Sequence, residues 1–400
     1  MKKESLYSFL SIAWVIIISL QFLRNEFSYI YFPVFILFIF LNCFFIIKYG
    51  YIFSITSHLG FFMWIFYLLS IYIALVTFFF GDLNDFMRAF PRMMLMPITV
   101  IFLYNFIFSD RQFYKLLNIY ILFGVIAGIS IIYQVFYGPL GFLVDTQIRD
   151  GLTRYASTLG SLTAYGGAIG IILIVNIFLN QNKFILNFIF ISILALAGII
   201  SLSKAGLLNV FIFGLYFLLF FKLEKKYYLF ICTIIASFSC YLLVPDIQIY
   251  IETAYQGLRI GVDIYQVQSL ETQAIDRLTR AIPKLAEHSI WNNFFGFGLL
   301  GGQGAFGLPY SFSGTTHNQF TEFFNIGGIL LFVNVISIFV CLMLKLYQLR
   351  KTEVLANIFY VCNLLAILNM FFFNGFFYQP ATSFVLWLSI VYVLHKEKII

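Results

Sequence analysis

The stretch TTHNQFTEFFNIGG, residues Thr315–Gly328, joins a long polar segment to a strongly apolar one. His317 and Asn318 therefore stand at the boundary between water and lipid. Thr316 followed three residues later by Gln319 is a capping-box pattern, which predicts a helix with His317 in its first turn. The helix dipole favours a neutral imidazole there, and a neutral imidazole can act as a general base on a hydroxyl. The alternative is that His317 is only an interfacial capping residue.

The chain around this stretch has the composition of a membrane protein. Of its 400 residues, 62% are hydrophobic and 10% are charged, whereas soluble domains are roughly half apolar and a quarter charged. The sequence predicts an all-α polytopic membrane protein with about twelve transmembrane helices and both termini on one side. The expected spans are 6–23, 29–47, 58–80, 93–109, 114–137, 160–179, 184–201, 205–221, 227–244, 320–344, 354–373 and 380–394.

Lysine and arginine divide unequally between the two sides of this predicted topology. One side has fourteen of the 24 basic residues, and such an excess in short loops marks the cytoplasm, where both termini are therefore expected. The +7 net charge then reports topology, and no nucleic-acid partner is expected. The inner side has twelve lysines and two arginines, and the outer side has two lysines and eight arginines. The outer ten are Arg24, Arg88, Arg92, Arg149, Arg154, Lys204, Arg259, Arg277, Arg280 and Lys284.

This bias has a chemical interpretation, because positive charge of either kind is enough to set topology. Arginine is the better planar, bidentate partner for phosphate or carboxylate. The sequence therefore favours an outer surface that holds a phosphorylated or acidic ligand. Chance in a small sample is the alternative.

Two outer segments are long. The outer loop 138–160 contains Arg154 and leads into a stretch of small residues. The large outer loop 245–316, between the ninth and tenth spans, divides the chain into 1–244, 245–316 and 317–400. Apolar residues at helical spacing in this loop predict an amphipathic helix with Arg277 and Arg280 on one side. These arginines are candidate site residues. The alternative is that they form only a solvated helix face attracted to lipid headgroups.

Lys204, in SLSKAGLL, lies between two apolar runs at the outer membrane edge. A lysine there is costly unless it faces a cavity or snorkels, so it is a candidate site residue. Gly296–Gly301 reads GFGLLG, but no strand-helix-strand unit surrounds it, and we expect no dinucleotide or other cofactor. Its glycines instead predict a loop close to a ligand or to another backbone. Cysteine and histidine spacing indicates neither a disulfide framework nor a metal site.

Several of these motifs resemble those of the bacterial O-antigen ligases and the Wzy-type O-antigen or capsule polymerases, which are membrane glycosyltransferases of the GT-C type. The resemblance lies in His317-Asn318 with Gly328 eleven residues after the histidine, and in the helix with Arg277 that leads into NNFFGFG. Arg154, in RYASTLG, resembles the arginine of the earlier outer loop in this family.

The sequence departs from the family pattern at two places. Lys204 stands where members with an SR motif usually have arginine, so phosphate binding there would use a point charge instead of a planar fork. The acidic residue often found shortly before the glycine is missing, and Glu322 is the nearest carboxylate.

The resemblance implies an enzyme of the inner membrane with a periplasmic active site. It implies metal-independent transfer of a glycan from undecaprenyl diphosphate to a sugar hydroxyl. Our hypothesis is that His317 acts as the general base and that the anomeric centre is inverted. Arg154 and Arg277, with Arg280 and Lys204 as additional candidates, are expected to hold the diphosphate, and Asn318 the substrate. The expected partners are the lipid-linked oligosaccharide, a chain-length regulator and a flippase.

The favoured function is that of a polymerase that joins lipid-linked repeat units. The first alternative is an O-antigen ligase that transfers the glycan to lipid A-core. More distant alternatives are a transporter or flippase of lipid-linked sugars and a non-catalytic lipid-binding protein of envelope assembly. A transporter would show an internal repeat or a charge pair at mid-membrane, and the sequence shows neither.

Overall fold

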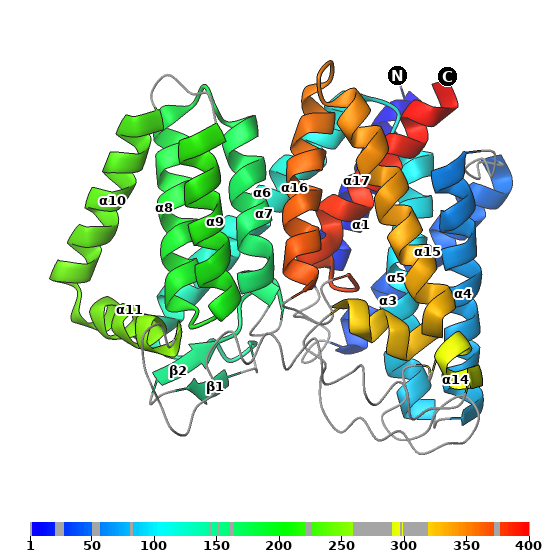
Figure 1. Cartoon of the computed structure of the whole chain (residues 1–400), viewed down its shortest axis with the longest axis horizontal. Helices are drawn as coiled ribbons and strands as arrows, with labels where there is room; N and C mark the ends of the chain where they lie inside the picture. Colours follow the sequence, from blue (N-terminus) through cyan, green and yellow to red (C-terminus); the bar gives the residue numbers. More distant parts are fainter. Residues whose placement is uncertain are drawn as a thin grey trace. The chain divides into compact units, whose positions relative to one another are not determined.

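The computed structural model is mostly helical (Figure 1). It describes residues 2–20, 28–49, 57–80, 83–143, 146–149, 152–160, 164–220, 226–258, 290–296, 298, 319–371 and 377–399. Three helices in this part of the chain are long and apolar enough to cross a membrane: α4 (His58–Phe80) over His58–Phe79, α6 (Asp110–Tyr137) and α15 (Gln319–Leu349). The prediction of a helical membrane protein is confirmed to this extent.

The other described elements follow the predicted spans in several places. The expected spans 184–201 and 205–221 correspond to two short apolar helices, α8 and α9. The remaining bounds are α1 (Lys2–Ser19), α3 (Ser28–Tyr49), α5 (Leu83–Phe106), α7 (Ala164–Leu179), α8 (Phe184–Ile200), α9 (Lys204–Phe220), α10 (Lys226–Leu243), α11 (Pro245–Leu258), α14 (Ile290–Phe295), α16 (Val354–Met370) and α17 (Pro380–Ile399). Two strands, β1 (Thr146–Arg149) and β2 (Leu152–Tyr155), complete the set.

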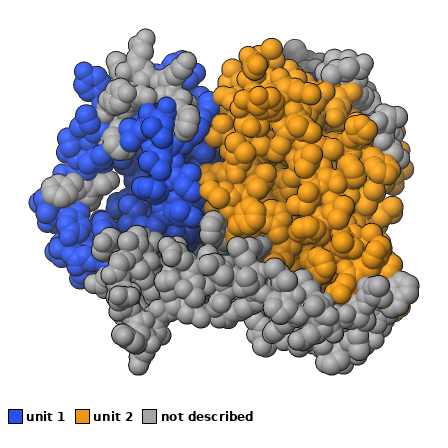
Figure 2. All heavy atoms as spheres, viewed as in Figure 1, with its two compact units in different colours: residues 1–38, 108–270, 380–382 blue, residues 39–107, 271–379, 383–400 orange. Residues whose placement is uncertain are grey.

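The chain forms two compact units (Figure 2). Unit 1 consists of Met1–Phe38, Phe108–Leu270 and Pro380–Thr382. Unit 2 consists of Ile39–Ile107, Glu271–Gln379 and Ser383–Ile400.

In unit 1, α6 packs against α7 and α8, and α7 packs against α9. The end of unit 1 at which α7 joins α8 is held by three buried asparagines, because polar groups among apolar helices need internal partners. Asn176 Nδ2 donates to Asn187 Oδ1 at 2.9 Å, and Asn180 Nδ2 donates to Asn176 Oδ1 at 2.9 Å. Asn187 Nδ2 donates to the carbonyl oxygen of Asn180 at 2.5 Å and completes the network.

At the other end of unit 1, the loop 138–160 contains an antiparallel hairpin, which corrects the all-α expectation. Strands β1 and β2 pair with Gln147 opposite Arg154 and Arg149 opposite Leu152. The sequence signal is the Asp-Gly dipeptide at 150–151, the commonest type of two-residue hairpin connection, between the alternating runs TQIR and LTRY. The hairpin therefore positions Arg154 on a strand.

In unit 2, α15 packs against α4, α14 and α16. The expected span 320–344 is longer in the structure and is interrupted by non-helical backbone at Gly327 and Gly328. Before this kink, the buried ring of Phe323 contacts that of Phe377 at 5.0 Å between centroids. After it, Asn334 Nδ2 donates to the carbonyl oxygen of Phe62 in α4 at 3.0 Å. The two parts of α15 are thus fixed separately.

Candidate functional site

Arg154 is buried in unit 1, with 8% of its surface exposed. Its Nε donates to the carbonyl oxygen of Ser201 at 3.3 Å, across 47 residues of sequence. Ser201 lies in the short turn between α8 and α9, and Lys204 is the first residue of α9. The structure therefore places two predicted site residues, Arg154 and Lys204, on the same small region. A guanidinium held by its Nε has its plane oriented by the backbone of that turn.

The segment that contains Arg154 is anchored to α6. Gln134, fully buried near the end of α6, donates through Nε2 to the carbonyl oxygen of Ala156 at 2.9 Å. Gln134 Oε1 accepts from the backbone N–H of Leu140 at 3.2 Å. One amide side chain thus holds both the beginning and the end of the loop, so the position of Arg154 follows from the end of α6.

Helix α11, at the start of the predicted loop 245–316, anchors the hairpin. The hydroxyl of Tyr250 donates to the carbonyl oxygen of Thr153 at 2.8 Å, next to Arg154 in β2. Burial, followed by the proximity of Tyr155 and Asp246, raises the pKa of Tyr250 well above its ordinary value. Tyr250 therefore stays a neutral hydrogen-bond donor at neutral pH.

The turn that receives Arg154 has unusual backbone geometry. Leu202 has a φ of 52°, in the left-handed region, which costs a residue other than glycine about 1–2 kcal/mol. The buried hydroxyl of Ser203 accepts from the backbone N–H of Gly206 at 3.4 Å and caps α9. Lys204 is partly exposed at the first position of that helix.

Close helix packing brings the first turns of α7 and α9 together. A Cβ on Gly166 would lie 2.3 Å from Ser203 Oγ and 3.0 Å from the backbone nitrogen of Gly206, so only glycine fits this position. Asn209 Nδ2, fully buried, donates to the carbonyl oxygen of Gly166 at 2.8 Å and fixes the same pair of helices.

This arrangement has the electrostatic character of an anion site. Lys204 is the first residue of α9, at the positive end of that helix dipole, and the guanidinium of Arg154 binds the turn just before the helix. The positive potentials of the helix dipole, Lys204 and Arg154 therefore add at this place. Without a bound anion, a lysine in the first turn of a helix is unfavourable, because it faces the positive end of the dipole. A phosphate or diphosphate is the ligand chemistry that such a group recognises.

In unit 2, the glycine loop after α14 lies against the kink of α15. The backbone N–H of Gly298 donates to the carbonyl oxygen of Ile326 at 2.9 Å. A Cβ on Gly328 would lie 2.3 Å from the carbonyl oxygen of Phe294, and one on Gly296 would lie 2.5 Å from the backbone nitrogen of Gly328. The prediction that these glycines bring the loop close to another backbone is confirmed. Two motifs of the family resemblance, NNFFGFG and Gly328, are therefore in direct contact.

The described part of α15 begins at Gln319, two residues after His317. Gln319 is fully buried, and its Oε1 accepts from the backbone N–H of Phe377 at 3.1 Å. Its Nε2 donates to Glu322 Oε2 at 3.0 Å. These two hydrogen bonds hold the first described residue of α15 in place, directly after the polar segment.

Four predicted site residues, His317, Asn318, Arg277 and Arg280, lie outside the described residues, as do Thr316 of the capping box and most of the predicted amphipathic helix. Among the residues that the structure describes, no group of three or more His, Cys, Asp or Glu side chains could hold a metal ion.

Sequence reasoning missed Ser201 and Ser203, which receive Arg154 and cap α9. Ser203 had a usable signal, because a serine just before an apolar run is a common N-cap. The role of Ser201 had none, since it is the backbone carbonyl that binds Arg154 and every residue type has one.

Comparison with known proteins gives the chain no family. No protein-family model matches it, and no curated protein matches it with significance.

Proposed function

We propose that this chain is a membrane glycosyltransferase that polymerises a surface polysaccharide of the O-antigen type. It moves a glycan from undecaprenyl diphosphate to a sugar hydroxyl of another lipid-linked repeat unit, at the periplasmic face of the inner membrane. The fold is GT-C-like with about twelve spans. The observation that carries the proposal is the buried contact of Arg154 with Ser201, in the turn that leads to Lys204.

This observation supports a diphosphate leaving group in particular. Departure of a diphosphate leaves negative charge on oxygen, and fixed cations and amide dipoles at that place lower the barrier. Arg154 is held by a hydrogen bond from Nε, so its charge is preorganised, and Lys204 adds a second positive charge at the start of a capped helix. The sequence independently indicated an arginine-rich outer surface, and both residues belong to it.

The proposed reaction breaks one bond and forms one. His317 takes the proton of the acceptor hydroxyl, whose oxygen attacks the anomeric carbon of the lipid-linked glycan. The bond between that carbon and the diphosphate oxygen breaks, and the diphosphate leaves with the electron pair. Attack from the side opposite the leaving group inverts the anomeric centre. Arg154, Lys204, Arg277 and Arg280 stabilise the diphosphate, Asn318 orients substrate, and no metal ion takes part.

The test uses the full-length protein in lipid nanodiscs with purified undecaprenyl-diphosphate-linked oligosaccharide, with polymer length read on a gel. We expect Arg154→Ala to reduce the rate by about 100-fold or more, the usual loss when one preorganised donor is removed. Arg154→Lys should recover part of that loss, because it restores charge without the planar fork. Arg111→Ala is the matched control, because Arg111 is exposed in the first turn of α6.

Two outcomes would contradict the proposal. Activity of Arg154→Ala equal to that of Arg111→Ala would remove the diphosphate site. Correctly inserted His317→Ala that still makes glycan products would remove the general base. A gel of lipopolysaccharide from cells that lack the protein separates the two enzymes: loss of a polymerase leaves lipid A-core with a single repeat, and loss of a ligase leaves bare core.

A further inference from the structure

The turn between α15 and α16 contains a cation held between two aromatic rings. The guanidinium carbon of Arg350 lies 4.2 Å from the ring centroid of Tyr347 and 4.6 Å from that of Tyr360. The two rings belong to different helices, and their centroids are 6.0 Å apart. Arginine stacks on aromatic faces through its plane and binds oxygen anions through its edges. The guanidinium of Arg350 therefore contacts two rings whose planes are tilted by 57° to each other, which restrains its position.

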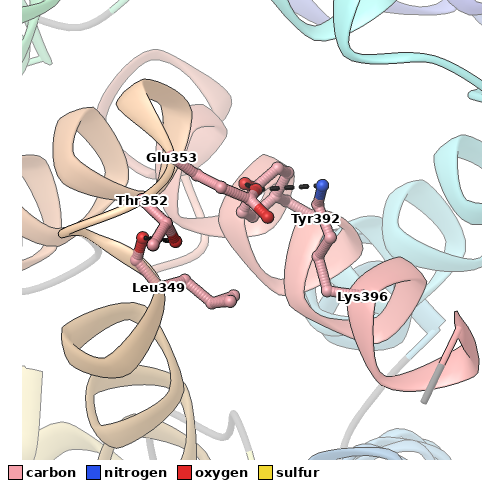
Figure 3. A network of polar contacts seen from close by, with 5 residues as sticks. All are labelled: Leu349, Thr352, Glu353, Tyr392 and Lys396. Atoms are coloured by element: carbon pink, nitrogen blue, oxygen red, sulfur yellow. Dashed lines mark hydrogen bonds and ion pairs between the residues drawn. The ribbon is translucent and has the colours of Figure 1, made fainter.

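The carboxylate nearest to Arg350 in sequence is engaged elsewhere. Glu353 accepts from the hydroxyl of Tyr392 and lies 2.9 Å from Lys396 Nζ, both in α17 (Figure 3). Partial burial acts to raise the pKa of Glu353, but the hydrogen bonds from Tyr392 and Lys396 and the charge of Lys396 bring it below its ordinary value. The negative charge of Glu353 is thus balanced by Lys396.

The turn consequently keeps a positive charge of its own. Lys351 is exposed next to Arg350, and within residues 319–371 the only other carboxylate is Glu322, near the opposite end of α15. Glu397 of α17 interacts electrostatically with Cys341, which lies about 13 Å before Arg350 along the axis of α15. In the described part of the chain, Arg350 has no carboxylate partner.

We infer that Arg350 and Lys351, with Tyr347 and Tyr360, bind the phosphate of an anionic phospholipid headgroup. The turn follows the long apolar helix α15, so it lies at a membrane surface, and the charge distribution of the sequence assigns that surface to the cytoplasm. Tyrosine rings favour this depth, and basic side chains there attract anionic lipid. The inference does not depend on the proposed catalytic function.

The competing role for Arg350 is purely intramolecular. Its backbone N–H donates to the carbonyl oxygen of Leu346 at 2.9 Å, so its charge also lies at the negative end of the α15 dipole. A cation in that place stabilises the helix without any lipid, and the two roles predict different results for lipid retention.

The test measures phospholipid retained by the full-length protein after extraction from bilayers of phosphatidylcholine and phosphatidylglycerol in equal amounts, by native mass spectrometry. We expect Arg350→Gln to retain about fivefold less phosphatidylglycerol, with phosphatidylcholine unchanged. Arg350→Lys should recover little of this loss, because an ammonium lacks the stacking plane. Arg111→Gln, with the same charge change on the predicted cytoplasmic side, should retain phosphatidylglycerol as the unmodified protein does.

The lipid site is overturned if Arg350→Gln retains as much phosphatidylglycerol as the unmodified protein, or if Arg111→Gln loses as much as Arg350→Gln. A mere stabilising role would lower the thermal unfolding temperature of Arg350→Gln while leaving lipid retention unchanged. Addition of inorganic phosphate should not displace the retained lipid. Displacement would show a site for free phosphate and would also overturn the inference.

Discussion

Gly328→Ala should detach α14 from the kink of α15. Gly328 has a φ of 63° and a ψ of −162°, a region that essentially only glycine occupies and that costs other residues about 1–3 kcal/mol. The new Cβ would also lie 2.3 Å from the carbonyl oxygen of Phe294 and 2.7 Å from the backbone nitrogen of Gly296. These are backbone atoms and cannot rotate away, so overpacking adds about 1–3 kcal/mol. The expected total is about 2–6 kcal/mol.

Hydrogen–deuterium exchange measured by mass spectrometry can localise this loss. Because α14 is short and binds the kink through backbone contacts, we expect faster exchange in residues 290–296 and lower thermal stability in detergent. Gly214→Ala is the matched control: it lies within α9, and a Cβ there meets nothing within 4 Å. That substitution should be neutral or stabilise the protein by up to about 1 kcal/mol. Equal exchange and stability in Gly328→Ala and Gly214→Ala would refute the reasoning.

Gly296→Ala provides the reciprocal test of the same contact. Its Cβ would lie 2.4 Å from the carbonyl oxygen of Ile326 and 2.5 Å from the backbone nitrogen of Gly328. Each single variant removes the same backbone approach, so the double variant should lose clearly less stability than the sum of the two single losses. Additive losses would mean that the two glycines do not form one contact.

Three further predictions concern hydrogen bonds in the two units. Tyr250→Phe removes the bond to Thr153 and should cost about 1 kcal/mol in thermal unfolding at neutral pH. Because burial raises the pKa of Tyr250, its contribution is complete below about pH 10 and is lost as pH rises through the folded pKa, so the two unfolding curves should converge in alkali. Lys396→Met removes a partly exposed ion pair with Glu353 and should lower the free energy of unfolding by about 0.5–1 kcal/mol. Because the pKa of Glu353 is lowered in the folded protein, this stabilisation is lost as pH falls through the folded pKa. The stability difference between Lys396→Met and the unmodified protein should therefore shrink at acidic pH. Asn187→Ala removes the acceptor of the buried Asn176 Nδ2 and one of the two donors to the carbonyl oxygen of Asn180, which keeps the backbone N–H of Lys183. It should cost about 1–3 kcal/mol, and an unchanged unfolding temperature would contradict the network.

The sequence predicted helices best where an apolar run ends in a clear polar break. The break SLSK separates the expected spans 184–201 and 205–221, and the structure ends α8 at Ile200 and begins α9 at Lys204. Prediction was poorer where helix and membrane boundaries differ. Helix α5 begins at Leu83, ten residues before its expected span, because polar residues can extend a helix beyond the lipid.

Contacts between distant segments were beyond sequence reasoning. The glycines of GFGLLG indicated a close approach, but not that the neighbour would be the kink at Gly328, since a glycine does not specify what it approaches. The contact of Arg154 with Ser201 uses a backbone carbonyl, which leaves no trace in residue type. The Asp-Gly signal of the hairpin, by contrast, is present in the sequence, although the prediction gave the loop 138–160 no secondary structure.

The position of Arg154 and Lys204 also bears on the predicted topology. An even number of membrane crossings between two segments returns the chain to the same side, and two helices, α7 and α8, separate these residues. Two more, α9 and α10, separate Lys204 from α11, whose Tyr250 binds the hairpin. The hairpin, the α8–α9 turn and α11 lie at one end of unit 1 (Figure 1), as that parity requires. A miscounted helix among these would have put one of the three at the opposite end, so the structure supports the prediction that Arg154 and Lys204 share one end of unit 1.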